Sequence, residues 1–317
     1  CRGARSRRRM NRRERLRRCY FNEEVDRPAV YSRAGFPADD PSYDRLKAYL
    51  LTHTELKERW AGISLEATPW VPRYSPTAAE RERRWGSADP AYPVEFHIEP
   101  YSSDFERRVT VLHTPAGDLE CSFLAGLQGQ PGIEERFLLK GSEDAEKYLS
   151  LPFPEFSGDV ASFFAADAEV GEAGIVDVSL GANPAGFTAK LFGSTVFALL
   201  SVTDRDILHV LCQRQMKIMV ERLKVLLSKK IGPFFSMASE EFVAPPLHGP
   251  ADFYDFNVKY DKPIIDLIHD VGGRVHIHCH GSIKRVFRGF IDMGADVLHP
   301  FEALPMGDIT PVEAKNQ

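Results

Sequence analysis

The feature that most constrains the fold is an alternation of apolar, strand-like runs with amphipathic helical segments, which becomes regular at residue 174. Each pair of runs is separated by a helical segment, and strands that are joined through helices run parallel. The predicted strands cover residues 174–180, 231–237, 274–279 and 295–299, and the predicted helices begin near residues 203, 261 and 282. This pattern predicts an α/β protein with a parallel sheet.

A parallel sheet of this kind is typical of two folds, a closed barrel or an open doubly wound sheet. No GxGxxG motif follows the early strand and no Walker loop is present, so a nucleotide-binding open sheet is disfavoured. The chain has 317 residues, and one α/β barrel needs roughly 250 residues or more. We therefore predict a TIM (β/α)8-type barrel that occupies residues 10–317 as a single domain and is incomplete at its C-terminus, with its last units missing. Residues 1–9, which precede Met10, are predicted to be an upstream extension.

The first half of the chain is less regular. A helix is predicted over residues 11–24 and a strand over 28–32, while residues 34–105 are expected to form excursions over the barrel rim. The turn Pro115-Ala-Gly-Asp118 lies between two strand-like runs and predicts a β-hairpin. Residues 142–149 are predicted to form a short helix.

Charge and cysteine content exclude several classes of protein. The formal net charge is -5, so no basic field indicates a nucleic-acid partner. Ten arginines crowd residues 1–18, but no apolar stretch follows them as a secretory signal requires, and a basic arm is the alternative reading. The longest apolar runs fall short of the roughly 18 residues that a membrane span needs. Five scattered cysteines without a CxxC motif indicate a reducing compartment, so we expect a cytoplasmic protein.

Histidines are concentrated in the segment Arg274-Val-His-Ile-His-Cys-His-Gly281. Side chains alternate along a strand, so His276, His278 and His280 share one face, opposite an apolar face. His278 and His280 fall at the carboxyl end of their strand, and His299 and Glu302 fall at the same end of the next one. Active sites of parallel barrels lie on that side, so the pattern predicts a metal site or a site of proton transfer. The alternative is a set of hydrogen-bonded core histidines.

Two further segments carry candidate residues. Glu240 and Glu241 follow the predicted strand 231–237 and are expected at the same end of the sheet, in a loop that prolines make rigid. Arg33 follows the first strand and could bind a carboxylate or phosphate through both guanidinium nitrogens. A solvated acidic loop and a surface arginine are the respective alternatives.

At these residues the chain resembles the uroporphyrinogen decarboxylase superfamily, which includes the decarboxylase of haem synthesis and its methyltransferase relatives. The similarity covers most of residues 10–317. The segment that begins Arg27-Pro-Ala-Val and continues Arg33-Ala-Gly resembles the carboxylate-binding signature of the decarboxylase. Phe36 stands where the decarboxylase has its second arginine, and the methyltransferase branch is the more similar one.

Several motifs carry the resemblance to that branch. Thr114-Pro-Ala-Gly117 resembles its Thr-Pro-x-Gly turn, and Pro246-Leu-His-Gly-Pro-Ala-Asp-Phe253 resembles the segment after its acidic site residue. His278-Cys-His280-Gly281 resembles its His-x-Cys-Gly zinc motif, with a histidine in place of the cysteine. The stretches Gly294-Ala-Asp, His299-Pro-Phe-Glu302 and Gly307-Asp308 resemble its next strand and site loop.

The resemblance implies a set of roles at this site. A zinc ion would be held by His278 and His280, with a third ligand on a later strand beyond Gln317, so the chain is expected to be truncated at its C-terminus. The implied catalytic residues are Glu241, Glu302 and Asp308, and the implied substrate-binding residues are Arg33, His248 and His299.

The function implied is zinc-assisted methyl transfer from a small methylated or methoxylated compound to a corrinoid protein or a thiol. The main alternative is decarboxylation of a tetrapyrrole, which needs no cofactor and would use Arg33 and Asp308. A metal hydrolase and a non-catalytic binding module are weaker alternatives. In each case the expected partner is a small molecule, joined by a corrinoid protein for methyl transfer, with no nucleic acid and no membrane.

Overall fold

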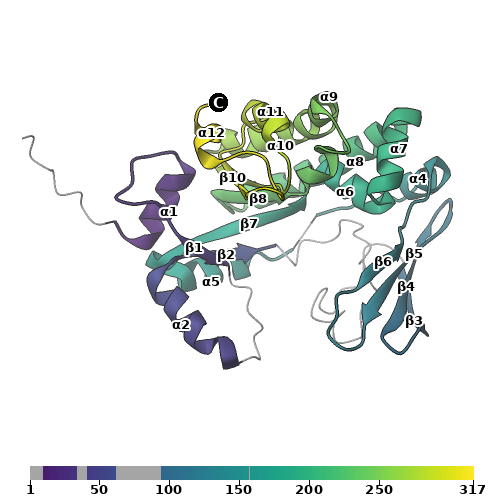
Figure 1. The fold of residues 1–317 in the computed structure, drawn as a ribbon, viewed down its shortest axis with the longest axis horizontal. Helices are drawn as coiled ribbons and strands as arrows, with labels where there is room; N and C mark the ends of the chain where they lie inside the picture. The colour runs from purple at the N-terminus through teal and green to yellow at the C-terminus, as the bar shows by residue number, and fades with distance from the viewer. Residues whose placement is uncertain (1–9, 34–40, 62–93, 157) are drawn as a thin grey trace, which may run out of the picture.

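A six-stranded parallel sheet forms the centre of the protein, as the computed structural model shows for residues 10–33, 41–61, 94–156 and 158–317 (Figure 1). Its strands follow one another in chain order, and every neighbouring pair is parallel. They are β1 Tyr31–Arg33, β2 Glu55–Trp60, β7 Gly174–Ala182, β8 Phe234–Ala238, β9 Arg274–His278 and β10 Val297–His299. The α/β fold with parallel strands is confirmed, but these strands form an open sheet, and no closed barrel is formed within the ranges given above. The predicted extension at residues 1–9 lies outside them.

The two faces of this sheet differ in chemistry because side chains alternate along each strand. On the outer face the strands contribute to one apolar cluster that includes Val176, Val178, Phe235, Val275 and Ile277. The opposite, inner face carries polar side chains, namely Lys57, Arg59, Asp177, Ser179, Ser236 and His276. Because the outer face is apolar and the polar side chains lie on the inner face, we expect a ligand to bind on the inner side of the sheet.

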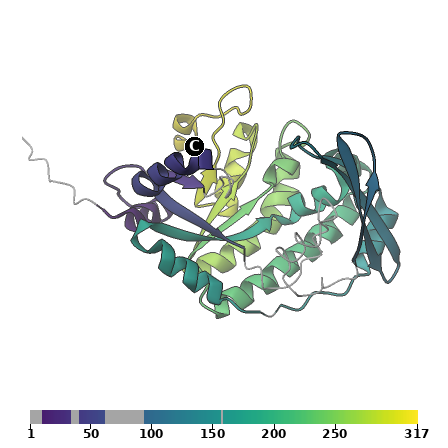
Figure 2. The ribbon, with the colours of Figure 1, turned by 90° about the horizontal axis from the view of Figure 1, so that it is seen from below.

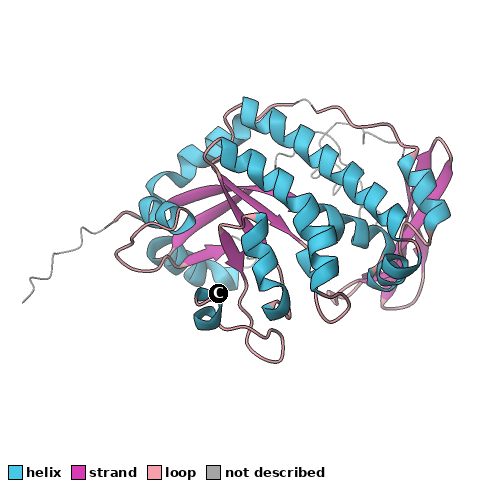
Figure 3. Ribbon diagram, turned by 90° about the horizontal axis from the view of Figure 1, so that it is seen from above, coloured by secondary structure: helices cyan, strands magenta, loops and turns pink. Residues whose placement is uncertain are grey.

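Helices cover the outer face (Figure 3). They are α5 Ala161–Val170, α8 Arg205–Ser228, α10 Lys259–Asp270 and α11 Phe287–Met293. Each contributes apolar side chains to the same cluster, such as Phe163, Leu223, Ile264 and Phe290. Burial of a large apolar side chain is worth about 1.5–3 kcal/mol, so this layer supplies much of the stability of the sheet.

Two consecutive short helices, α6 Pro184–Phe192 and α7 Ser194–Thr203, follow β7 and were not predicted from the sequence. The Asn183 side chain caps α6 by accepting a hydrogen bond from the Gly186 amide at 2.8 Å, and Pro184 occupies the first turn. Gly193, at φ 76°, separates the two helices. Within the described chain no single helix is long and apolar enough to cross a membrane; α6 and α7 meet that test only as a pair bent by 107°.

Helix α1 Arg12–Tyr20 closes the amino end of the inner face. Its N-cap is Asn11, whose side chain accepts a hydrogen bond from the Glu14 amide at 2.7 Å. From the helix, Leu16 and Tyr20 pack against Ile175 and Phe234 of the sheet, in a small cluster of buried residues. The inner face is therefore sealed at this end.

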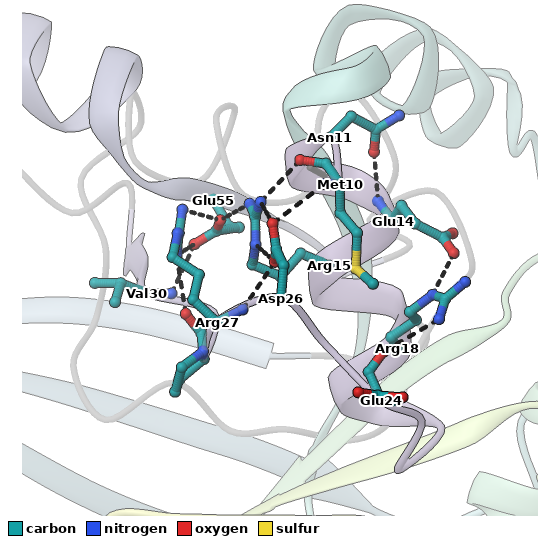
Figure 4. A network of polar contacts seen from close by, with 11 residues as sticks. Met10, Asn11, Glu14, Arg15, Arg18, Glu24, Asp26, Arg27, Val30 and Glu55 are labelled. Carbon is teal, nitrogen blue, oxygen red and sulfur yellow. Dashed lines mark hydrogen bonds and ion pairs between the residues drawn. The ribbon is translucent and has the colours of Figure 1, made fainter. Parts of the chain in front are cut away.

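A buried ion-pair network fixes α1 to the start of β2 (Figure 4). The Arg15 guanidinium donates to both carboxylate oxygens of Asp26 and, at 2.7 Å, to Oε1 of Glu55. Glu55 also accepts hydrogen bonds from Arg27 at 2.7 Å and from the Val30 amide at 2.6 Å. These bonds hold the pKa of Glu55 below its ordinary value although burial acts in the opposite direction.

A second, antiparallel sheet lies at one end of the molecule (Figure 2). Its strands are β3 Val94–Pro100, β4 Phe105–Thr114, β5 Gly117–Gly126 and β6 Ile133–Arg136, followed by α4 Ser142–Leu149. The predicted hairpin and the predicted helix over 142–149 are confirmed. Leu112 and Leu119 of the hairpin share an apolar cluster with Phe187 of α6 and Leu208 of α8, so the antiparallel sheet packs against helices that flank the central sheet.

The stretch predicted to form excursions, residues 34–105, contains more regular structure than expected. It includes α2 Asp44–His53, strand β2 and strand β3. Because β2 pairs with β1 and β7 in the central sheet, the expectation of a rim excursion is wrong for that strand. Residues 34–40 and 62–93 of this stretch lie outside the described chain.

Candidate active site

Two histidines meet at the carboxyl ends of β9 and β10. His278 and His299 are the last residues of these strands and are paired in register. Their Nδ1 atoms are 2.9 Å apart, and their rings stack with centroids 5.1 Å apart. At that separation one ring donates its N–H and the other accepts. The structure thus brings together two residues that the sequence placed at equivalent strand ends.

His280 and Glu302 form a second pair next to the first. The His280 ring lies 4.6 Å from the His278 ring, and its Nδ1 is 3.0 Å from Oε1 of Glu302. The other oxygen of Glu302 accepts the Gly281 amide at 2.8 Å. The hydrogen bond from the Gly281 amide makes the largest contribution to a lowered pKa of Glu302, and the hydrogen bond from His280 makes the next largest. An ionised carboxylate accepts only, so Nδ1 of His280 donates and Nε2 of the neutral ring carries the free lone pair.

Glu241 reaches the same place from the strand before. It follows β8 in the short helix η3 Glu240–Val243, which begins after Ser239 in a left-handed conformation at φ 89°. The ring and the backbone of His280 both influence the pKa of Glu241, so the carboxylate lies close to His280. Burial raises the pKa of Glu241, while Lys190 and His280 act in the opposite direction. An acid that holds its proton more tightly than usual therefore lies beside the His280–Glu302 pair.

A polar group that the sequence did not predict continues the site along the inner face. The Lys57 ammonium lies 2.6 Å from Nδ1 of His276 and 3.6 Å from Asp177. Asp177 also accepts a hydrogen bond from Ser236 at 2.7 Å. Burial raises the pKa of Asp177, and Lys57 opposes the shift. The signal that could have found this group is Asp177 itself, because it is the one charged residue within an apolar strand.

The other predicted site residues lie in different surroundings. Asp308 accepts a hydrogen bond from the Lys284 amide at 2.8 Å, at the start of the short helix η5 Lys284–Val286. Its observed role is therefore that of a helix cap. Arg33 ends β1 and is paired in register with Lys57, and its side chain lies outside the described part.

His248 is not placed among the clustered histidines. Its buried ring packs edge-on against Phe197 of α7, and its Nδ1 lies 3.8 Å from Asp252 of α9 Pro250–Asp252. Burial lowers the pKa of His248. This is the environment of a core histidine, and no contact with His278, His280 or His299 is seen among the described residues.

Behind the site lies a pair of fully buried acids, Glu240 and Asp261. Asn183 donates to both Asp261 oxygens, at 3.1 and 3.0 Å. In the described chain no other residue donates a hydrogen bond to either Glu240 oxygen. Burial, together with the repulsion between the two acids, raises the pKa of Glu240 well above its ordinary value. The π-helix Phe253–Val258, which leads into α10, contributes Asn257 to the same buried group.

This buried acid predicts a pH-dependent stability. The folded state keeps a proton on Glu240 that the unfolded chain releases above its ordinary pKa of 4.5, so the free energy of unfolding should fall as pH rises from that value. The slope is at most about 1.4 kcal/mol per pH unit for each proton. Glu240→Gln removes this contribution, so its free energy of unfolding should fall less between pH 5 and pH 8 in urea titrations. Glu146→Gln, at an exposed position of α4, is the matched control, and equal slopes in both variants would contradict the assignment.

The donors at the strand ends only partly suit a metal ion. Imidazole nitrogen and carboxylate oxygen are ligands that zinc accepts. In the arrangement observed, however, the Nδ1 atoms of His278 and His299 face each other and His280 is bonded to Glu302. No group of three His, Cys, Asp or Glu residues in the described ranges is arranged to hold one metal ion. Cys279 is fully buried in the outer apolar cluster, as its strand parity predicts. The described residues thus do not form a complete zinc site.

Comparisons with known proteins leave the family of the chain open. No family model matches the chain, and no curated protein matches it in sequence. A solved methyltransferase from Methanosarcina mazei is similar in fold, with a TM-score of 0.49 and 12% sequence identity, over 91% of this chain and 75% of that chain. At this TM-score and identity, the likeness establishes neither the family nor the activity of this chain.

Proposed function

We propose that the protein is an enzyme that transfers a methyl group from a small methylated or methoxylated compound to a thiol or a corrinoid, and that it belongs to the methyltransferase branch of the uroporphyrinogen decarboxylase superfamily. The observation that carries the proposal is the convergence of His278, His280, His299, Glu302 and Glu241 at the carboxyl ends of β8, β9 and β10. We also propose that the open sheet represents successive strands of a (β/α)8-type barrel, because its strand order equals its chain order.

The proposed chemistry assigns a role to each group. Glu302 orients His280, so that Nε2 of His280 accepts the proton of an incoming thiol. The thiolate sulfur then bonds to the methyl carbon, whose bond to the leaving group breaks with the electron pair staying on the leaving group. Glu241, which holds its proton more tightly than an ordinary glutamic acid, supplies a proton to an alkoxide leaving group.

No step of this chemistry depends on a metal ion, and zinc stays a prediction. Elemental analysis measures the zinc content of the purified full chain and of the variants His278→Ala and His280→Ala. Zinc that the parent protein binds through the predicted ligands should be lost from both variants, because each variant removes one of these two ligands from a site that needs three or more. Equal zinc content in all three proteins would contradict the predicted ligands.

Methyl transfer to a thiol is tested with methylcobalamin as a surrogate methyl donor and 2-mercaptoethanol as the acceptor, because this pair needs no knowledge of the natural substrate. Transfer of the methyl group to the thiolate releases cob(I)alamin, whose absorbance reports the rate under anaerobic conditions. We expect the full chain to accelerate this reaction and His280→Ala to abolish the acceleration, while Arg288→Gln, on the exposed side of α11, leaves it unchanged.

Decarboxylation is the second candidate, since Arg33 lies at the end of β1, the segment that resembles the carboxylate-binding signature. Incubation with uroporphyrinogen separates the two functions. Formation of coproporphyrinogen, with no demethylation of methylcobalamin, would overturn the proposal of methyl transfer.

A further inference from the structure

The short helix η3, which carries Glu241, is held by a buried side chain from another element. Asn257 lies in the π-helix Phe253–Val258 and is fully buried. Its Nδ2 donates to the carbonyl oxygens of Glu240 at 3.1 Å and of Val243 at 3.4 Å. These carbonyls belong to the first and last residues of η3, so one amide group holds both ends of the turn in which Glu241 lies.

The partners of Asn257 determine the orientation of its amide group. A carbonyl oxygen only accepts hydrogen bonds, so the atom of Asn257 that faces Glu240 and Val243 is the nitrogen. Its Oδ1 accepts a hydrogen bond from Nδ2 of Asn183 at 2.9 Å, and Oδ1 of Asn183 in turn accepts the Gly186 amide at 2.8 Å. A buried amide whose two donors and oxygen are all engaged keeps one orientation, and it therefore fixes the position of its partners.

The turn begins in a strained backbone conformation. Ser239, directly before η3, has φ 89°, a region that residues other than glycine rarely adopt. Lys190 donates to the Ser239 hydroxyl at 2.6 Å, and Gly186 lies so close that a β-carbon at that position would be 2.5 Å from Cβ of Ser239. Strained backbone persists only where its surroundings hold it, and it is concentrated at active sites. Loss of the Asn257 bonds should therefore allow η3 to move.

A displacement of η3 would change one group of the site. Glu241 lies between the two residues whose carbonyls Asn257 binds, and its carboxylate is close to His280. The bonds that Glu302 accepts from the His280 ring and the Gly281 amide do not involve η3. Asn257 is therefore placed to control the acid of the site without contacting its base.

We infer that Asn257 is a positioning residue of the proposed methyl transfer: by holding both ends of η3, it keeps the Glu241 carboxyl where it can protonate the leaving group. The inference rests on the proposed function in that Glu241 is taken as the acid. A leucine at this position has no donors, and an aspartate would turn oxygens toward two carbonyl oxygens. A serine has one donor on a shorter side chain, so it can bind at most one of the carbonyls.

Hydrogen–deuterium exchange of the full chain tests the hold on η3 and requires no substrate. In Asn257→Ser and Asn257→Leu, the amides of residues 240–243 should exchange about tenfold faster than in the parent protein, because hydrogen bonds to η3 are lost. Tyr260→Phe is the matched control, since it removes a buried hydroxyl bonded to Nδ1 of His209 at 2.8 Å and leaves η3 untouched. Circular dichroism and urea unfolding establish that each variant folds, and Asn257→Ser carries the test if Asn257→Leu does not.

A double-mutant cycle on kcat separates positioning from a general loss of structure. The probes are 2-methoxyphenol as the methyl donor and 2-mercaptoethanol as the acceptor. The thiolate takes the methyl group, and the phenolate that leaves takes the proton of Glu241 and is released as catechol, which reports the rate. Asn257→Ser should lower kcat by about 10–10²-fold while KM for the thiol changes little. In the Glu241→Gln background the same substitution should have little further effect, because the acid that Asn257 positions is already absent.

The outcomes distinguish this inference from the proposed function. Equal exchange of η3 in Asn257→Ser and Tyr260→Phe, or an equal loss of kcat with and without Glu241, would overturn the inference in a protein that still transfers methyl groups. Transfer from methylcobalamin alone would also overturn it, because that leaving group needs no proton from Glu241. If neither donor is used by the parent protein, the proposed function fails, and faster exchange in the Asn257 variants would leave Asn257 only as the residue that fixes η3.

Discussion

Arg15→Ala should lower the free energy of unfolding by about 3–5 kcal/mol, the range found when one partner of a buried ion pair is removed. Arg15 is 3% exposed and Glu55 is fully buried. Without the guanidinium, Glu55 loses its buried partner at 2.7 Å and keeps Arg27, which is 45% exposed. Urea unfolding followed by circular dichroism measures the change.

The control for this prediction lies on the same helix. Arg17 pairs with Glu14 and Glu23 on the surface, with side-chain exposures of 35–40%, so Arg17→Ala should cost about 0–1 kcal/mol. The pH dependence gives a second check. The pKa of Glu55 is lowered in the folded state from its ordinary value of 4.5, so its contribution is present above that value and is lost as pH falls through the folded value. Arg15→Ala should therefore lose less stability than the parent between pH 5 and pH 3, and parallel curves would refute the assigned network.

Glu302→Gln should lower kcat for methyl transfer by about 10²–10⁴-fold, the usual contribution of a positioned acid or base. The carboxylate accepts from Nδ1 of His280 and leaves Nε2 as the base. A glutamine amide can donate to Nδ1 instead, which places the proton on Nε2 and removes the base. The fold should be retained, because the side chain keeps its size and one oxygen for the Gly281 amide.

The methylcobalamin and 2-mercaptoethanol assay measures this effect over a range of pH. A positioning role requires that kcat falls while KM for the thiol changes little, and that the pH profile of the variant differs from that of the parent. Glu313→Gln is the matched control, since Glu313 is a surface carboxylate paired with Lys284 at 2.8 Å. A variant at Glu302 with the kcat and pH profile of the parent would remove the His280–Glu302 pair from the mechanism.

Strand parity explains which parts of the fold and site the sequence could predict. The run from Val275 to His280 alternates apolar and imidazole side chains, so its two faces, the position of Cys279 and the meeting of His278 with His299 follow from local pattern. The neighbouring strands β8 and β10 were also predicted from the local pattern of apolar residues. The zinc ligands and the methyl-transfer role stay predictions, because they depend on groups that no pattern within one strand determines.

Other parts depend on tertiary contacts that no local pattern encodes. Strand β2 has the sequence Glu-Leu-Lys-Glu-Arg-Trp, which resembles an exposed segment. It can lie inside the sheet because Glu55 and Lys57 form ion pairs with Arg15 and Asp177, which are far away in the sequence. A (β/α)8-type barrel without its last units was predicted, but the alternation of helices and strands fixes the direction of the strands and not their number. Glu240 was expected at the carboxyl end of the sheet, with a solvated acidic loop as the alternative, and its complete burial beside Asn257 and Asp261 follows only from tertiary packing.

The apolar cluster between the hairpin and the helices connects the antiparallel sheet to the site. Phe256 and Tyr260 belong to the same apolar cluster as Leu112 and Leu119 of the hairpin. The residue after Phe256 is Asn257, whose amide donates to the carbonyl oxygens of Glu240 and Val243, at 3.1 and 3.4 Å. A continuous path of buried contacts therefore runs from the hairpin through Phe256 and Asn257 to the backbone beside Glu241.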